Sequence, residues 1–190
     1  MPRPRSEKIR QSVLAAMRRA LAAEGYEAVT IEGLAAEAEV SKQTIYRWWP
    51  SKAAILGEAL LEGALPGAAD PVPATADLSA DLRAWFTAVS DGLAQPEGLA
   101  VARALIAVTT ADPALGAALN ERFAGPIAAG IVERIDTARA AGDVRADVDA
   151  TVLAEQFIAV ASYEALLGRP LDRDRVEAVV GIVLRGIAAG

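Results

Sequence analysis

The stretch that decides the fold is TIEGLAAEAEVSKQTIYRWWPSKA, residues 30–53. Apolar side chains in its first half have the i, i+3, i+4, i+7 spacing of one helical face. The members of that face are Ile31, Leu34, Ala35 and Ala38. Thr30 precedes this run and can cap it, because its hydroxyl accepts a free backbone N–H of the first turn. The pattern predicts a short helix that begins after Thr30.

A second short helix is expected from Lys42 to Trp48, with Ser41 as its cap. Ile45 points inward on this helix, together with Trp49 just beyond it. The outer face carries Lys42, Gln43, Tyr46 and Arg47. A short helix with an apolar back and a cationic, amide-bearing and aromatic front suits the DNA major groove. We therefore interpret the two helices as a helix-turn-helix.

The composition favours an all-α protein. The chain has 190 residues, of which 53% are hydrophobic, and few β-branched residues alternate as in a strand. No uninterrupted apolar run reaches the roughly 20 residues that cross a bilayer. The N-terminus, MPRPRSEKIR, lacks the apolar segment of a signal peptide. We expect a cytoplasmic protein with no membrane partner.

The chain contains no His and no Cys. Disulfides, thiolate metal sites and Ser-His or Cys-His nucleophiles are therefore excluded. Acidic residues such as Asp143, Asp147 and Asp149 fall in a predicted turn, where solvated carboxylates are common. We expect no metal, no cofactor and no enzymatic activity.

The charge is distributed unevenly along the chain. The net charge is −6, yet residues 1–52 carry nine Lys or Arg and only six Asp or Glu. A basic head on an acidic body attracts phosphate to one end of the molecule. Small imbalances of this kind are common, so the charge alone is also compatible with an ordinary solvated surface that binds no DNA.

The same stretch resembles the DNA-binding domain of TetR/AcrR-type bacterial transcriptional regulators. The matching features are the apolar helix ending in AAEAEV, then SKQTIY, then RWWPSKAAIL. The resemblance implies a three-helix helix-turn-helix domain at 1–52 and a helical ligand-binding and dimerisation domain at 53–190. One position departs from the pattern, because Glu39 stands where the family usually has Gly. A side chain there costs on the order of 1 kcal/mol if φ is positive.

The predicted DNA contacts lie on or beside the second helix. They are Thr30, Ser41, Lys42, Gln43, Thr44, Tyr46, Arg47, Trp48 and Lys52. Lys42, Gln43 and Arg47 are candidates for base edges, since Lys and Arg match guanine and Gln matches adenine. Thr44 can meet either a thymine methyl group or a phosphate.

The remaining contacts are expected on the DNA backbone. The resemblance implies phosphate contacts for Thr30, Tyr46 and Lys52. Lys52 also lies at the start of the next helix, where free N–H groups favour a phosphate. Trp48 leaves two interpretations open, a sugar–phosphate contact or packing, whereas Trp49 is expected in the core.

Beyond a Pro- and Gly-rich loop at 63–75, the sequence predicts six more helices. Their expected ranges are 78–93, 96–110, 113–124, 126–141, 150–167 and 173–188. The last one is apolar around most of its circumference, so it should bury two surfaces. Similar proteins pair through their final two helices. We therefore expect a homodimer in which Leu153, Phe157, Val160 and Leu167 contribute from the partner helix.

A two-fold dimer would place two recognition helices one duplex turn apart, about 34–36 Å, on a pseudo-palindromic operator in double-stranded DNA. The resemblance also implies a small-molecule effector in the larger domain. Candidate wall residues, which could equally form core, are Trp85, Phe86, Phe123, Phe157 and Tyr163.

The resulting hypothesis is a dimeric, sequence-specific DNA-binding regulator, a repressor released from its operator by a small apolar or amphipathic ligand. The alternative is an all-helical binding or scaffolding protein whose helix-turn-helix does not engage DNA. Glu39 keeps that alternative open.

Overall fold

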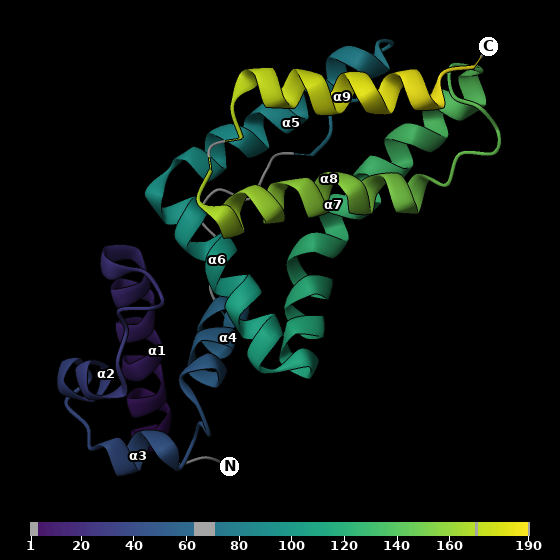
Figure 1. The fold of residues 1–190 in the computed structure, drawn as a ribbon. Coiled ribbons are helices and arrows are strands. Elements are labelled where there is room, and N and C mark those ends of the chain that lie inside the picture. Colours follow the sequence, from purple (N-terminus) through teal and green to yellow (C-terminus); the bar gives the residue numbers. More distant parts are fainter. Residues whose placement is uncertain (1–3, 63–70, 170, 190) are drawn as a thin grey trace. The chain divides into compact units, whose positions relative to one another are not determined.

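The computed structural model describes residues 4–62, 71–169 and 171–189. Within these ranges the chain forms nine helices and no strand, apart from a single bridge between Val144 and Ala188. The helices are α1 (Pro4–Glu24), α2 (Ile31–Glu37), α3 (Lys42–Tyr46), α4 (Lys52–Glu62), α5 (Leu78–Ala94), α6 (Pro96–Ala111), α7 (Pro113–Ala141), α8 (Ala150–Leu167) and α9 (Arg173–Ile187) (Figure 1). The all-α prediction is confirmed.

Two compact units make up the chain. Unit 1 comprises Met1–Pro66 and Ala100–Leu119, and unit 2 comprises Gly67–Leu99 and Asn120–Gly190. Helix α4 belongs to unit 1 together with α1, α2 and α3. The compact units therefore differ from the expected division after Lys52, which stays a prediction about functional domains.

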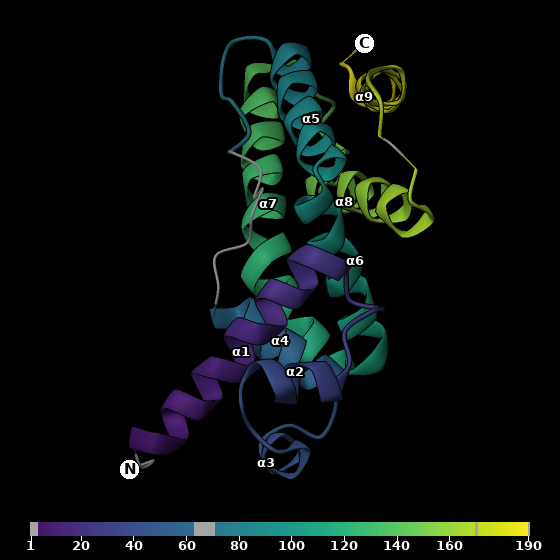
Figure 2. The same cartoon turned by 90° about the vertical axis from the view of Figure 1, so that its left-hand side faces the viewer.

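In unit 1 the long helix α1 packs against both α2 and α4. Figures 1 and 2 show these helices grouped, with α3 beside α2. Apolar side chains from all four helices are buried. They include Val13, Leu14, Met17, Leu34, Ile45, Ile55, Leu56 and Leu60. The buried positions of α1 and α4 repeat at three- and four-residue steps, as expected for amphipathic helices on a shared core.

The predicted helix starts at Thr30 and Ser41 are confirmed. Each side chain accepts a backbone N–H of its helix, and each cap residue has extended backbone angles. Helix α3 ends at Tyr46, two residues earlier than predicted. Beyond it, two successive backbone N–H groups both bond to the carbonyl of Ile45. The chain tightens at this point, and Trp49 beyond it is buried in the core.

The prediction of two helices at 113–124 and 126–141 was wrong. The structure has one continuous helix, α7, with Pro126 inside it. Pro removes one helical hydrogen bond and costs about 3 kcal/mol. Pro126 is exposed, and the turns that follow it bury Ile131 and Ile135 completely. Burial of such side chains, worth about 1.5–3 kcal/mol each, offsets the lost bond.

Unit 2 is built around a cluster of three aromatic rings. The Phe86 and Phe157 rings meet edge to face, with centroids 5.0 Å apart, and Trp85 lies within 5.7 Å of both. Helix α5 carries two of these rings and packs against α8 and α9. Aliphatic side chains such as Leu82, Ile131, Val176 and Val180 close the core around them.

Helix α8 has the length and hydropathy that could cross a membrane, and it is the one such helix among the described residues. Its Phe157 is fully buried, and its Glu164 is buried in an ion pair. These contacts anchor α8 in unit 2.

A buried ion pair fixes the segment that leads into α5. Arg134 of α7 donates to Asp81 of α5 at 2.7 Å, and the two side chains are 5% and 2% exposed. Asp81 also accepts the backbone N–H and the hydroxyl of Thr75, at 2.9 and 2.7 Å. Burial by itself raises the pKa of Asp81, but the hydrogen bonds from Thr75 and Arg134 outweigh it and leave that pKa below its ordinary value.

Replacing Asp81 tests this arrangement. Asp81→Asn should lower the free energy of unfolding by about 3–5 kcal/mol, because it leaves the buried Arg134 charge uncompensated. Asp81→Asn combined with Arg134→Met should cost less than the single change. Urea denaturation of wild type, the single variant and the double variant at pH 7 measures both losses of unfolding free energy. Equal losses in the two variants would contradict the proposed role of the Arg134 charge.

The lowered pKa of Asp81 also predicts that the free energy of unfolding depends on pH in the acid range. A carboxylate with a lowered pKa contributes stability that is complete above the unfolded-state value, about 3.9, and is lost as the pH falls toward the folded-state value. The stability difference between wild type and Asp81→Asn should therefore shrink below about pH 4.

Candidate nucleic-acid interface

The outer face of α3 is arranged by its cap and by one buried residue. Ser41 accepts the backbone N–H of Thr44 at 3.1 Å, and the two hydroxyl oxygens lie 2.9 Å apart. Ile45 is completely buried. Side chains on the opposite face are therefore turned to solvent, as the predicted DNA contacts require. The exposed ones are Lys42, Gln43, Tyr46 and Arg47.

Lys42 has a partner that the sequence analysis did not identify. Its ammonium group forms an ion pair with Glu32 of α2, with Nζ and Oε1 2.7 Å apart. The hydrogen bond between them raises the pKa of Lys42 and lowers that of Glu32. Both side chains are more than half exposed, so water and salt screen the pair. The predicted base contact by Lys42 would require it to exchange Glu32 for a base edge, and that contact stays a prediction.

Thr30 lies at the start of α2 on the exposed surface. Its hydroxyl oxygen accepts the backbone N–H of Gly33 at 3.0 Å. A hydroxyl that accepts one bond can still donate another. Capping is therefore compatible with the predicted phosphate contact.

The two tryptophans after α3 have different environments. Trp49 is 3% exposed, which confirms its predicted place in the core, and its indole N–H donates to Glu58 of α4 at 2.5 Å. Trp48 is half-buried, and its indole nitrogen is covered and has no hydrogen-bond partner. In this conformation a DNA contact by Trp48 would come from its ring rather than from its N–H.

Lys52 has a structural role that the sequence did not indicate. Its ammonium group donates to the carbonyl oxygens of Tyr26 and Val29, both at 2.9 Å, and lies 4.2 Å from the Tyr26 ring centroid. These bonds hold the loop that leads to the Thr30 cap. No local pattern predicts partners 23 and 26 residues away. A third N–H remains for a phosphate, and that contact stays a prediction.

The turn between α2 and α3 has the backbone that the sequence analysis anticipated. Glu39 has φ of +55° and is the one residue other than Gly with positive φ in the described chain. The N–H of Glu39 bonds to Ala36, and that of Val40 bonds to Ala35. This pair of bonds is a Schellman motif, in which the position of Glu39 favours Gly.

The proposed wall of the ligand site is not brought together. Trp85, Phe86 and Phe157 are buried in contact with one another, which makes them core of unit 2. Phe123 is half-buried, with Arg122 over its ring, and Tyr163 is 53% exposed. Among the described residues, no ring contact joins either of these two to the buried group.

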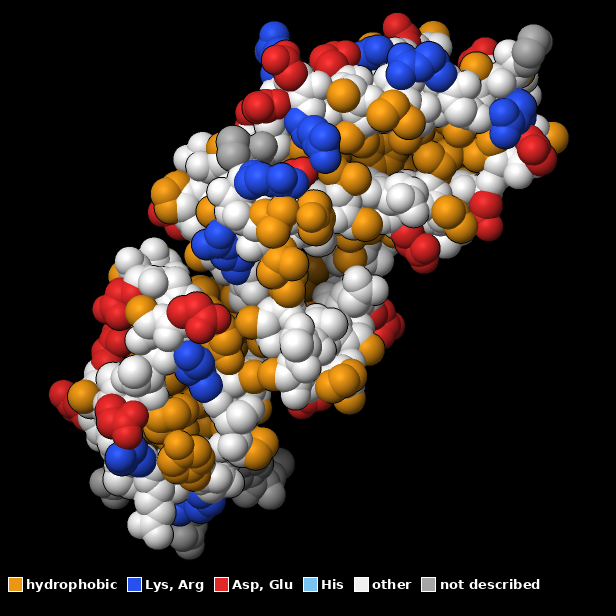
Figure 3. Space-filling view, in the orientation of Figure 1, with side chains coloured by type: hydrophobic (Ala, Val, Ile, Leu, Met, Phe, Trp, Pro, Cys, Tyr) orange, Lys and Arg blue, Asp and Glu red, His pale blue; other side chains and the backbone are white. Residues whose placement is uncertain are grey.

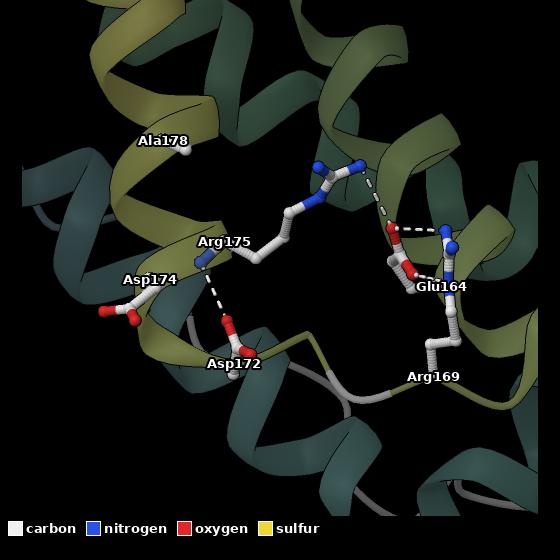
Figure 4. Close-up of a pocket in the computed structure, with 6 residues that line it drawn as sticks. All are labelled: Glu164, Arg169, Asp172, Asp174, Arg175 and Ala178. Atoms are coloured by element: carbon white, nitrogen blue, oxygen red, sulfur yellow. Dashed lines mark hydrogen bonds and ion pairs between the residues drawn. The ribbon is translucent and has the colours of Figure 1, made fainter.

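A surface cavity of about 430 Å³ lies elsewhere in unit 2, where α8 ends and α9 begins (Figure 4). Its floor is the buried carboxylate of Glu164, which accepts from Arg169 at 2.9 and 3.2 Å and pairs with Arg175 at 3.3 Å. Asp172 caps α9 at its rim. Five of the six residues that line the cavity are charged, and both arginines pair with Glu164.

A capped short helix on a buried core, with cationic and amide side chains facing outward, defines a helix-turn-helix DNA-binding protein. Two family descriptions match the chain. "Bacterial regulatory proteins, tetR family" matches residues 13–59, and "Tetracyclin repressor-like, C-terminal domain" matches residues 72–183. The chain belongs to the TetR family of DNA-binding transcriptional regulators, and it is therefore not an enzyme.

Individual relatives span nearly the whole chain. The uncharacterized HTH-type transcriptional regulator YdeS of Bacillus subtilis is 29% identical over 98% of this chain and 93% of its own length. The DNA-binding transcriptional repressor TetR of Mycobacteroides abscessus is 28% identical over 95% and 94%. The crystal structure of the TetR family transcription regulator SCO0332 is 32% identical, with a TM-score of 0.59 over 95% and 99%.

Glu39 can be tested by two substitutions. Glu39→Gly should raise the free energy of unfolding by about 1 kcal/mol, because Gly adopts positive φ without a side-chain penalty. Glu39→Gln keeps that penalty and removes only the charge. Urea denaturation should therefore separate the two variants.

If α3 enters the major groove, both variants should also bind DNA more tightly than wild type at low salt, since each removes a carboxylate that would then lie near the phosphates. Fluorescence anisotropy with labelled duplex measures this. Unchanged affinity in Glu39→Gln would place the carboxylate away from the duplex, and unchanged stability in Glu39→Gly would contradict the strain.

Proposed function

We propose that this regulator is a dimeric repressor that leaves its operator when a small apolar or amphipathic ligand binds. The observation that carries the proposal is the exposed row of Lys42, Gln43 and Arg47 above the buried Ile45. The repressor role is supported by the relative from Mycobacteroides abscessus, which is named a DNA-binding transcriptional repressor. A protein of this kind acts on chromosomal DNA, so we place it in the cytoplasm.

Base reading is assigned to Lys42, Gln43 and Arg47, whose donor groups match major-groove edges. Backbone contacts are assigned to Thr30, Ser41, Tyr46, Trp48 and Lys52, with Thr44 at either a thymine methyl or a phosphate. Backbone contacts fix the register of the protein on DNA, and base contacts select the sequence.

A scaffolding protein with an inactive helix-turn-helix is the weaker alternative. It depended on the disruption expected from Glu39, yet the turn closes with both hydrogen bonds of the Schellman motif. Helix α3 keeps its cap and its buried Ile45. The geometry required for DNA reading is therefore compatible with Glu39.

The dimer is proposed to form through α8 and α9. Hydrophobic side chains gather over these helices in Figure 3, and five of the six large hydrophobic side chains that are exposed in the described chain lie on them. The five are Val152, Tyr163, Leu166, Leu167 and Ile182. An apolar surface of this kind marks an interaction site.

The expected partner contact by Phe157 was wrong, because its ring is fully buried in its own unit. Leu153 and Val160 are partly buried and remain candidates, as does Leu167.

An apolar ligand is proposed to bind within unit 2, near the aromatic rings. Because Trp85, Phe86 and Phe157 are packed together, a ligand among them must separate the rings. Binding would therefore select a rearranged core. The difference in ligand affinity between the packed and the rearranged core would shift the equilibrium between them, with a coupling free energy of typically about 1–3 kcal/mol.

Helix α4 is the proposed transmitter of that shift. Gly57 of α4 lies against Leu115 at the start of α7, and both belong to unit 1. A Cβ atom on Gly57 would stand 2.2 Å from Cδ2 of Leu115. This close approach couples any displacement of Leu115 directly to α4, since packed groups cannot absorb it.

Arg47 provides the test of sequence reading. Arg47→Ala should cost about 1–3 kcal/mol of operator affinity and relax preference at one position per half-site. Arg19→Ala is the control, because it removes an exposed arginine of α1 that pairs with Glu37. Mobility shifts on DNA from upstream of the gene, with single-base variants, measure both. Equal, sequence-independent losses in the two variants would show that Arg47 does not read a base.

Ile182 provides the test of the dimer. The side chain is 65% exposed, so Ile182→Arg should leave the fold intact while placing a charge in the proposed interface. Sedimentation should give a dimer for wild type and a monomer for the variant at micromolar concentration. Ala129→Arg adds the same charge to an exposed position of α7 and should remain dimeric. A wild-type monomer, or a dimeric Ile182→Arg protein, would exclude this interface.

A further inference from the structure

The end of the recognition helix is held by few contacts. Helix α3 has five residues, and Ile45 is its one buried side chain. The chain beyond α3 is fixed by Trp49, which is 3% exposed and donates its indole N–H to Oε2 of Glu58 at 2.5 Å. Glu58 is therefore one of the groups that fix where the end of α3 lies on the core.

Glu58 belongs to α4, and its other carboxylate oxygen is bound by Arg10 of α1. Arg10 is itself enclosed by acidic groups, with Glu7 at 2.8 Å and Glu62 at 2.6 Å. The Arg10 side chain is 17% exposed, and these carboxylates, Glu7 first, raise the pKa of Arg10. Arg10 therefore stays charged and holds Glu58 in place.

A hydrogen bond to a carboxylate is shorter and stronger than one between neutral groups. The bond from Trp49 to Glu58 satisfies the N–H of a buried indole with a charged acceptor. It joins three segments, α1, α4 and the end of α3, through two side-chain contacts.

We propose that Glu58 is a positioning residue for DNA binding: its carboxylate, oriented by Arg10, fixes the end of the recognition helix through Trp49. Glu58 and Glu62 lie one turn apart on α4 and both contact Arg10. A displacement of α4 carries the acceptor away from the indole and releases α3. This last step rests on the proposed ligand response, whereas the positioning role does not.

The indole N–H signals of the folded protein give a direct test that needs no DNA. The chain has three tryptophans, and Trp48→Phe and Trp85→Phe identify the Trp49 signal by elimination. In Glu58→Ala that signal should move upfield, because the charged acceptor is lost. In Glu58→Gln, which keeps an acceptor, it should move less. Glu37→Ala is the matched control, since Glu37 also pairs with an arginine of α1 and has similar exposure.

Operator binding then tests the function of the contact, measured on a duplex from upstream of the gene. Glu58→Ala should bind about tenfold more weakly than wild type, the effect of losing one charge-assisted hydrogen bond. Glu58→Gln should recover part of the loss, and Glu37→Ala should stay within about twofold. Thermal melting confirms that each variant is folded.

An unmoved Trp49 signal in Glu58→Ala, or folded Glu58→Ala and Glu37→Ala proteins of equal affinity, would overturn the positioning role. If wild-type protein fails to bind the duplex, the proposed function fails, and the Trp49 signal alone then decides whether Glu58 holds the indole. If Glu58→Ala does not fold, Glu58→Gln carries the same comparison.

Discussion

The burial of Ile45 is the constraint on which the DNA-binding unit depends. A helix of five residues is far too short to be stable alone. Ile45 and Trp49 are buried on the core of unit 1, and each such burial contributes about 1.5–3 kcal/mol. The caps by Thr30 and Ser41 add about 1 kcal/mol each. Since the inner face supplies the stability, the outer face is free to carry polar groups suited to DNA.

The turn before this helix shows what its position costs. Helices α7 and α8 end in the same hydrogen-bonded motif as α2, with Gly142 and Gly168 at the residue of positive φ. Among the described helices, α2 alone has a residue other than Gly at this position of positive φ, and that residue is Glu39. The strained residue thus lies next to the helix proposed to bind DNA, and strained backbone residues cluster at functional sites. If the proposed surface meets DNA, the negative charge of Glu39 would weaken attraction to phosphate there.

Most local features could be predicted from the sequence, because caps, stops and apolar faces depend on neighbouring residues. Helix α8 was predicted with its observed limits. The predicted break at Pro126 was wrong, since the burial of Ile131 and Ile135 beyond it offsets one lost hydrogen bond. The partners of Lys52 and Trp49 could not be predicted, because they depend on how distant segments pack. Phe157 was misassigned to a partner contact for the same reason, as its ring is enclosed by α5.

Methylation protection on DNA from upstream of the gene tests the placement of α3 most directly. Dimethyl sulfate modifies guanine N7, which lies in the major groove. If α3 reads that groove, bound protein should protect guanines in two half-sites about 10 base pairs apart, and Arg47→Ala should restore the reactivity of one guanine per half-site. DNA that is bound while all its guanine N7 atoms remain reactive would contradict this placement.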